Sequence, residues 1–86
     1  MAGYRLAIKP SAVKEIEAVG PKKDRRRIVA LISGLADNPF PPGARKLSGR
    51  SRYRLRSGRY RILYEVADSE RQVVVVKVGH RKDVYR

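Results

Sequence analysis

Arginines in the second half of the chain form the pattern that points most directly to chemistry. Between residues 45 and 61 the sequence holds eight Lys and Arg residues and no Asp or Glu. An arginine binds phosphate through a planar fork of N–H donors and stays protonated at physiological pH. Because a merely solvated basic surface would scatter its charge, this clustering predicts a binding site for a polyanion. The residues expected to bind it are Arg45, Lys46, Arg52, Arg54 and Arg56.

Four further side chains could act on a bound phosphate. Arg61 is the last residue of the cluster, and the segment 79–86 contains His80, Arg81 and Tyr85. Guanidinium groups stabilise developing negative charge, an imidazole can carry a proton, and a tyrosine ring can stack on an unpaired base. RNA can be cut without a metal, because its own 2′-hydroxyl can attack the adjacent phosphate. We therefore expect a metal-independent RNA-cleaving site, although His80 could equally be a packing residue and Tyr85 a cover for the sheet edge.

Composition excludes several other chemistries. The chain has no cysteine and one histidine, so it can build neither a thiolate site nor a zinc site from these ligands. Its eight carboxylates include no obvious convergent set for a two-metal nuclease. We expect no metal and no cofactor.

The formal charge of +13 on 86 residues indicates a polyanionic partner. Nucleic acid is the first expectation, an acidic protein the second and an anionic membrane surface the third. The first ten residues resemble neither a signal peptide nor a membrane span. The cytoplasm is therefore the expected location.

The first half of the chain predicts one strand and two helices. Tyr4, Leu6 and Ile8 alternate with other residues, which is the period of a strand with one buried face. Ser11 can cap a helix, and Gly20–Pro21 indicates a helix end followed by a new start. The expected apolar stripes are Ala12, Val13, Ile16 and Val19 in the first helix, and Ile28, Leu31, Ile32 and Leu35 in the second, which Asn38–Pro39 ends.

The second half predicts three strands after a proline-rich loop at residues 39–43. Tyr53 and Leu55 alternate with arginines, a turn is expected at Ser57–Gly58, and residues 60–66 alternate again. Val73–Val76 is a β-branched run typical of a central strand covered on both faces. We predict one α+β domain over residues 1–86, with both helices on one face of a mainly antiparallel four-stranded sheet. The arginines, and the chain end from residue 79, would then share the open face.

Three segments carry a resemblance to a known family. They are Lys46–Gly49, Tyr53–Glu65 and Val78–Tyr85, and the similarity extends from Tyr4 to Arg86. The sequence resembles the RelE/ParE toxin superfamily. The resemblance implies a RelE-like fold and a toxin that cuts messenger RNA in the ribosomal decoding site and is neutralised by an acidic antitoxin.

The resemblance also implies roles for individual residues. Arg61 matches the arginine that stabilises the transition state, Arg81 the arginine that protonates the leaving group or holds its phosphate, and Tyr85 the tyrosine that orients the base. Arg54 and Arg56 match positions where well-known RelE members have lysines, one of them proposed as the general base. Two alternative functions are a ParE-like inhibitor of DNA gyrase without ribonuclease activity and a non-catalytic nucleic-acid-binding module.

Overall fold

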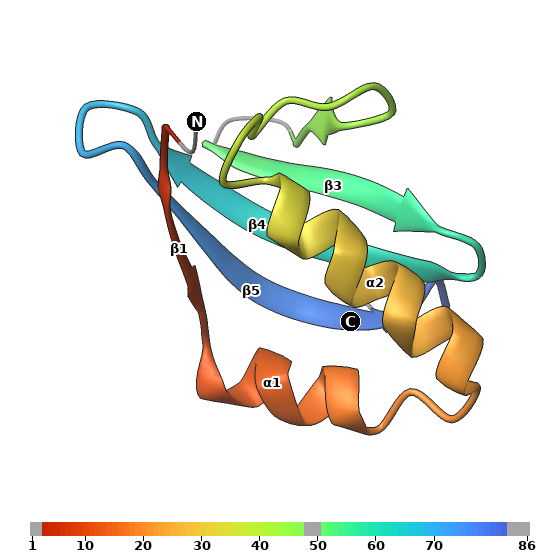
Figure 1. Ribbon diagram of the computed structural model, residues 1–86. Coiled ribbons are helices and arrows are strands. Elements are labelled where there is room, and N and C mark those ends of the chain that lie inside the picture. The colour runs from red at the N-terminus through yellow and green to blue at the C-terminus, as the bar shows by residue number, and fades with distance from the viewer. Residues whose placement is uncertain (1–2, 48–50, 83–86) are drawn as a thin grey trace.

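The computed structural model describes residues 3–47 and 51–82 and places two helices on one face of a five-stranded sheet (Figure 1). The strand order is β1-β5-β4-β3-β2, with β1 parallel to β5 and every other pair antiparallel. The α+β class and the mainly antiparallel sheet are thus confirmed. The elements are β1 (Arg5–Ile8), α1 (Pro10–Glu17), α2 (Lys22–Gly34), β2 (Arg45–Lys46), β3 (Arg52–Ser57), β4 (Tyr60–Ala67) and β5 (Gln72–His80).

The expected number of four strands was wrong, because the sequence pattern did not predict β2. This strand has two residues, which are too few to show any alternation. It pairs with β3 and forms one edge of the sheet. Its importance is positional, since it brings Arg45 and Lys46 beside the arginines of β3.

The helix boundaries also differ from the expectation. Lys9 is the N-cap of α1 and Pro10 its first residue, so Ser11 lies inside the helix and does not cap it. The fixed φ angle of proline suits the first helical position, where its missing N–H removes no hydrogen bond. The second helix ends at Gly34, before the expected Asn38–Pro39 stop.

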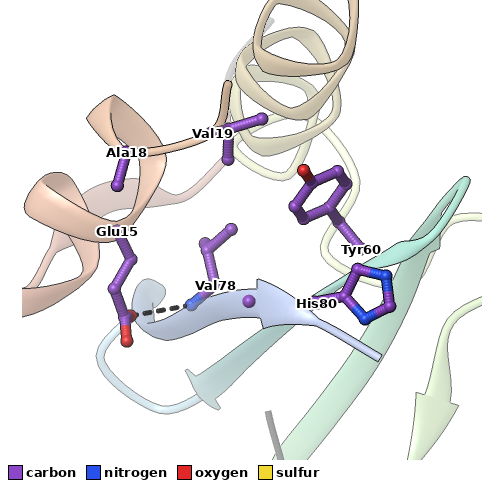
Figure 2. A pocket seen from close by; sticks show the side chains of 7 residues that line it. Glu15, Ala18, Val19, Tyr60, Val78 and His80 are labelled. Carbon is purple, nitrogen blue, oxygen red and sulfur yellow. Dashed lines mark hydrogen bonds between the residues drawn. The ribbon is translucent and has the colours of Figure 1, made fainter. Parts of the chain in front are cut away.

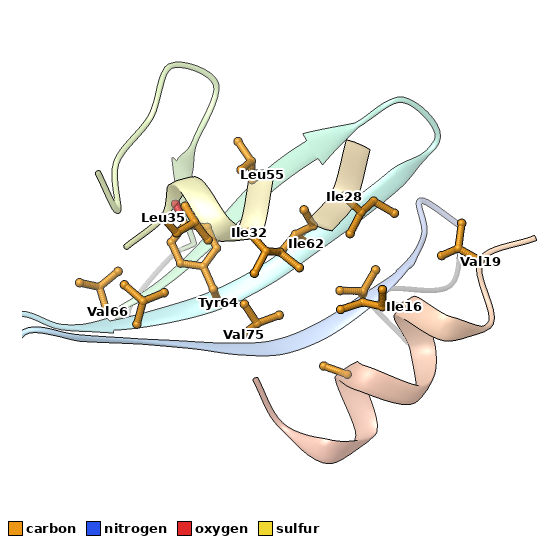
Figure 3. Packing of buried hydrophobic residues seen from close by; sticks show 13 residues of the cluster. Ile16, Val19, Ile28, Ile32, Leu35, Leu55, Ile62, Tyr64, Val66 and Val75 are labelled. Carbon is orange, nitrogen blue, oxygen red and sulfur yellow. The ribbon is translucent and has the colours of Figure 1, made fainter. Parts of the chain in front are cut away.

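The core lies between the helices and the sheet (Figure 3). Ile28, Ile32 and Leu35 of the α2 region are at most 2% exposed, as the stripe predicted. Val13 was expected there but is 39% exposed, because Ala12 and Ile16, four residues apart, define the inward face of α1. The sheet contributes Leu55, Ile62, Tyr64, Val66, Val73, Val75 and Val78.

The valine run of β5 is covered on one face rather than two. Val73 and Val75 are fully buried under the helices, whereas Val74 and Val76 are half-buried on the opposite face. The strand does lie inside the sheet, between β1 and β4. Neither helix covers this second face, which we call the open face of the sheet (Figure 1).

The turn between β3 and β4 sets the register of the hairpin. Gly58 and Arg59 connect the paired residues Ser57 and Tyr60, and Gly58 has a φ of +60°. A two-residue loop with glycine first and positive φ there matches the hairpin turn whose twist suits the flanking strands. Register is fixed as a result, and with it the face on which each arginine lies.

The turn between β4 and β5 fastens β1 at the other end of the sheet. The Tyr4 hydroxyl donates to the Asp68 carboxylate, and the Arg71 guanidinium lies 4.8 Å from the centre of the Tyr4 ring. Arg71 Nε also donates to the Gly3 carbonyl at 2.7 Å. The hydrogen bond to Asp68 is the largest cause that raises the pKa of Tyr4 above its usual value.

Tyr64 links the core to the loop that precedes β2. Its ring is fully buried, and its hydroxyl donates to the Pro39 carbonyl oxygen at 2.7 Å. Burial, with a smaller contribution from Tyr53, raises the pKa of Tyr64 to about 12. Ionisation of this hydroxyl is therefore coupled to unfolding.

We predict that alkaline pH destabilises the fold mainly through Tyr64. The unfolded chain releases this proton near the ordinary tyrosine pKa of 10.0 and the folded chain near 12, so stability is full below pH 10 and falls as pH rises toward 12. Tyr64→Phe should remove most of this slope and leave a smaller one of the same sign from Tyr4. At neutral pH it should destabilise by about 1–3 kcal/mol, because the Pro39 carbonyl loses its donor. Urea unfolding at several pH values measures both effects, and identical pH dependence in the two proteins would contradict the prediction.

Candidate nucleic-acid interface

The open face of the sheet carries rows of side chains set by cross-strand register. In one row Arg45, Arg54, Leu63 and Lys77 lie opposite one another across β2, β3, β4 and β5. The next row holds Arg56, Arg61 and Gly79. Cross-strand partners share a face, so these residues lie away from the helices. We call Arg45, Arg54, Arg56, Arg61 and Lys77 the cationic floor.

Two pairs within the floor place like charges directly opposite each other. Arg45 faces Arg54 and Arg56 faces Arg61. Such pairs are destabilising in a sheet unless an anion lies between them. Arg54 Nε is in addition buried without a hydrogen-bond partner, and it is one of two such side-chain atoms in the described part of the chain. A phosphate oxygen would supply the missing acceptor and relieve the repulsion.

Arg52 is held by a carboxylate, that of Glu65 on the neighbouring strand. Its Nη2 and Nε lie 2.7 and 3.2 Å from Glu65 Oε2. The two side chains are 31% and 43% exposed, so the pair adds little stability but cancels a charge. The expectation that Arg52 contributes to the open face is correct in position, while its charge is largely neutralised by Glu65.

Arg61 is held against the hairpin turn. Its Nη1 donates to the carbonyl oxygens of Gly58 and Tyr60 at 3.3 and 3.1 Å. Gly79, its partner on β5, has no side chain.

Arg81 lies just beyond β5 and is exposed. Its N–H donates to the Arg59 carbonyl oxygen at 2.8 Å, so the β4–β5 register continues for one more step. Alternation puts position 81 on the same side as Gly79 and Arg61. The structure thus brings two of the predicted catalytic arginines to one end of the floor.

A register shift in β5 explains one residue that sequence reasoning missed. Leu63 pairs with Lys77 but Tyr64 pairs with Val75, which leaves Val76 as an extra residue. The shift reverses the alternation, so Val75 and Val78 both face the helices and Lys77 joins the floor. Strict alternation from Val73 would have placed Lys77 in the core, and a charged residue at that position was the available signal.

The same shift moves His80 away from the floor. His80 pairs with Tyr60 on the helix side, where the ring centres are 5.9 Å apart in an edge-to-face arrangement (Figure 2). Its Nδ1 accepts from the Lys82 N–H at 3.3 Å. The expectation that the imidazole would share the face of the arginines was wrong.

His80 instead borders a pocket of about 230 Å³ between α1 and the end of the sheet. Glu15, Ala18 and Val19 line its helix side (Figure 2). Glu15 Oε1 accepts from the Val78 N–H at 3.0 Å, which satisfies a backbone donor of β5 beyond the end of β1. The surroundings of His80 match the packing interpretation better than the catalytic one.

The remaining predicted residues fall in three places. Arg45 lies on the floor, and Lys46, opposite Tyr53, lies on the helix side of the same edge. Both are exposed. Tyr85 lies outside the described residues.

Within residues 3–47 and 51–82 no group of three or more His, Cys, Asp or Glu side chains could hold a metal ion. No helix in these ranges is long and apolar enough to cross a membrane.

Comparison with known proteins defines the class of this chain. A family model described as the ParE toxin of the type II toxin–antitoxin system parDE matches residues 6–85. Toxin RelG of Mycobacterium tuberculosis is 42% identical over 86 residues, which cover 96% of this chain and 97% of that protein. The protein is therefore a toxin of a type II toxin–antitoxin system.

Solved structures of RelE toxins have the same fold as this chain. A chain of the archaeal RelE–RelB complex from Pyrococcus horikoshii matches with a TM-score of 0.79 and 26% identity, over 95% of this chain and 99% of that one. A mutant RelE toxin of Escherichia coli in the free state matches with a TM-score of 0.75 and 30% identity, over 95% and 86%. The chain belongs to the RelE/ParE superfamily and has the RelE-like fold, as the sequence resemblance predicted.

We predict that Glu65→Gln strengthens RNA binding. The substitution releases the Arg52 guanidinium from its partner, so the slope of log K against log salt concentration should steepen by about 0.7 for a single strand. Glu70→Gln is the matched control, because it makes the same charge change in the exposed turn after β4. Fluorescence anisotropy with a short RNA at several salt concentrations measures both variants. Equal effects of the two substitutions would show that only net charge matters.

Proposed function

We propose that this toxin is a metal-independent, ribosome-dependent endoribonuclease that cleaves messenger RNA on the cationic floor. One observation carries the proposal. The like-charged pairs Arg45–Arg54 and Arg56–Arg61 lie on a sheet face that no helix covers. A polyanion bound to this face would be attracted by the five cations of the floor together. The similar proteins are RelE toxins, and the sequence resemblance to that family implies messenger RNA as the polyanion.

The chemistry follows from what the floor supplies. The 2′-oxygen bonds to the adjacent phosphorus while the bond from phosphorus to the 5′-oxygen breaks, which leaves a 2′,3′-cyclic phosphate and a 5′-hydroxyl. Negative charge accumulates on the phosphorane oxygens between these steps. Arg61 and Arg56 are proposed to stabilise this charge, and Arg81 to hold or protonate the leaving side. Tyr85 is proposed to stack on the base.

Proton transfer is the smaller part of this proposal. Preorganised donors around a developing oxyanion often contribute on the order of 10²–10³ in rate, without any titration. His80 lies on the other face, so a direct role as base is not supported by its position. Lys77 is the one amine on the floor among the described residues.

The proposed partners are messenger RNA in the ribosomal decoding site and an acidic antitoxin, both of which place the toxin in the cytoplasm. A groove of about 450 Å³ between α1 and α2 suits the apolar side of an amphipathic segment. Ile16, Val29 and Ala30 give it an apolar lining, and its charged residues are Arg25, Arg26 and Glu17, which leave a net positive charge. An antitoxin could use this groove, the floor or both.

We predict that Arg61→Ala lowers single-turnover cleavage of ribosome-bound messenger RNA by about 10²-fold or more. His80→Ala should have a much smaller effect, because its side chain lies on the helix side of the sheet. Lys14→Ala, on the exposed side of α1, controls for the loss of one positive charge. The reverse ranking of Arg61 and His80 in folded variants would overturn the electrostatic mechanism and leave the ribonuclease activity itself standing.

The activity itself is tested by primer extension on messenger RNA from translation reactions with and without the toxin. New ends at fixed positions within codons are expected. Intact messenger RNA together with accumulating gyrase–DNA cleavage complexes would instead identify a ParE-like gyrase inhibitor. Binding to RNA without either product would indicate a non-catalytic module.

We predict that Val29→Glu weakens binding of the acidic antitoxin by about tenfold or more and leaves messenger RNA cleavage intact, because it puts a negative charge into the apolar lining and offsets the positive charge of Arg25 and Arg26. Val13→Glu is the matched control, since Val13 is similarly exposed on α1 but does not line the groove. Isothermal titration with the antitoxin measures the difference. A basic antitoxin, or one that tolerates Val29→Glu, would contradict the expected partner.

A further inference from the structure

Phe40 lies on the loop between α2 and β2 and is 45% exposed. Single apolar side chains are common on protein surfaces, so exposure alone carries no inference. Val29 and Val13, on the helices, are 46% and 39% exposed. Phe40 differs from them in how firmly its ring is held and in the charges beside it.

A series of contacts fixes the ring of Phe40 to the core. It packs edge-to-face on Tyr53 with ring centres 5.2 Å apart, and Tyr53 stacks on the buried Tyr64 at 5.7 Å. The Phe40 N–H donates to Asn38 Oδ1 at 2.9 Å, and the preceding Pro39 carbonyl accepts from Tyr64. An exposed ring held in this way loses little conformational entropy when a ligand covers it.

Cations flank this ring on the β2 edge. Lys46 pairs with Tyr53, the residue on which Phe40 packs, and Arg45 pairs with Arg54 of the floor. Both β2 residues are exposed and lie on opposite sides of the edge. A nucleic-acid strand that leaves the floor across β2 would therefore meet Arg45, Lys46 and then Phe40.

We infer that Phe40 is a stacking platform for an unpaired base of the bound RNA, at the β2 edge and outside the catalytic floor. A flat ring next to cations matches the alternation of base and phosphate along a single strand. An amphipathic peptide would instead bind in a groove, such as that between α1 and α2, where its apolar side can be buried. The inference rests on the proposed function only in taking RNA as the ligand.

The sequence offers a direct test, because it contains no tryptophan. Phe40→Trp introduces a single tryptophan at the platform, and Val29→Trp introduces one at similar exposure on α2. Titration with a short single-stranded RNA should quench the fluorescence of the Phe40→Trp variant and leave that of the Val29→Trp variant unchanged. Inorganic polyphosphate, which carries charge but no bases, should quench neither. Equal quenching by both polymers, or in both variants, would overturn the inference.

Affinity gives a second and independent readout. Phe40→Ala should weaken binding of the same RNA about tenfold, and Phe40→Tyr should retain it, because both tyrosine and phenylalanine present a ring for stacking. Circular dichroism checks that each variant is folded. Unchanged affinity in folded Phe40→Ala would contradict the platform.

The outcomes separate this inference from the ribonuclease proposal. Quenching of the Phe40→Trp variant by RNA, combined with no cleavage of messenger RNA by the wild-type toxin, would keep the platform and reject the nuclease. Cleavage of messenger RNA by the wild-type toxin, without quenching of the Phe40→Trp variant by RNA, would keep the nuclease and reject the platform. A blue shift of the same fluorophore with the acidic antitoxin, and no response to RNA, would assign the surface to the protein partner and overturn the inference.

Discussion

The separation of charge from core across the β3–β4 hairpin is the constraint on which the rest of the structure depends. Side chains in a strand alternate between two faces, so a register that buries Leu55, Ile62 and Tyr64 must send Arg54, Arg56 and Arg61 to the other face. The Gly58 turn fixes that register. A slip by one residue would bury arginines and expose the core together, so the stability of the fold and the existence of the cationic floor have the same cause.

The register shift in β5 extends this division to the third strand of the site. It keeps Val75 and Val78 under the helices, brings Lys77 to the floor and sends His80 to the opposite side. The floor thereby gains an amine and does not gain the imidazole. This arrangement fits the proposed catalysis through fixed positive charge.

Sequence periodicity predicted the features that depend on the local spacing of apolar residues. The two helices, the hairpin and the face of Arg54, Arg56 and Arg61 follow from apolar spacing and were found as expected. Strict alternation gives the wrong face for His80 and Lys77, because one extra residue in β5 reverses it, and the charge of Lys77 is the one local sign of that shift. The Arg52–Glu65 ion pair was not predicted, because it depends on the register between two strands. The strand β2 was not predicted, because its two residues are too few for a periodic signal.

The most direct measurement of the central claim is a cryo-EM structure of the toxin on a translating ribosome whose messenger RNA carries a 2′-deoxynucleotide at the cleavage position. Removal of the attacking hydroxyl traps the uncut strand. The account predicts that the scissile phosphate lies over the open sheet face, within hydrogen-bond distance of Arg61 and next to Gly79. A strand bound along α1 and α2, with the cationic floor facing away from messenger RNA, would contradict it.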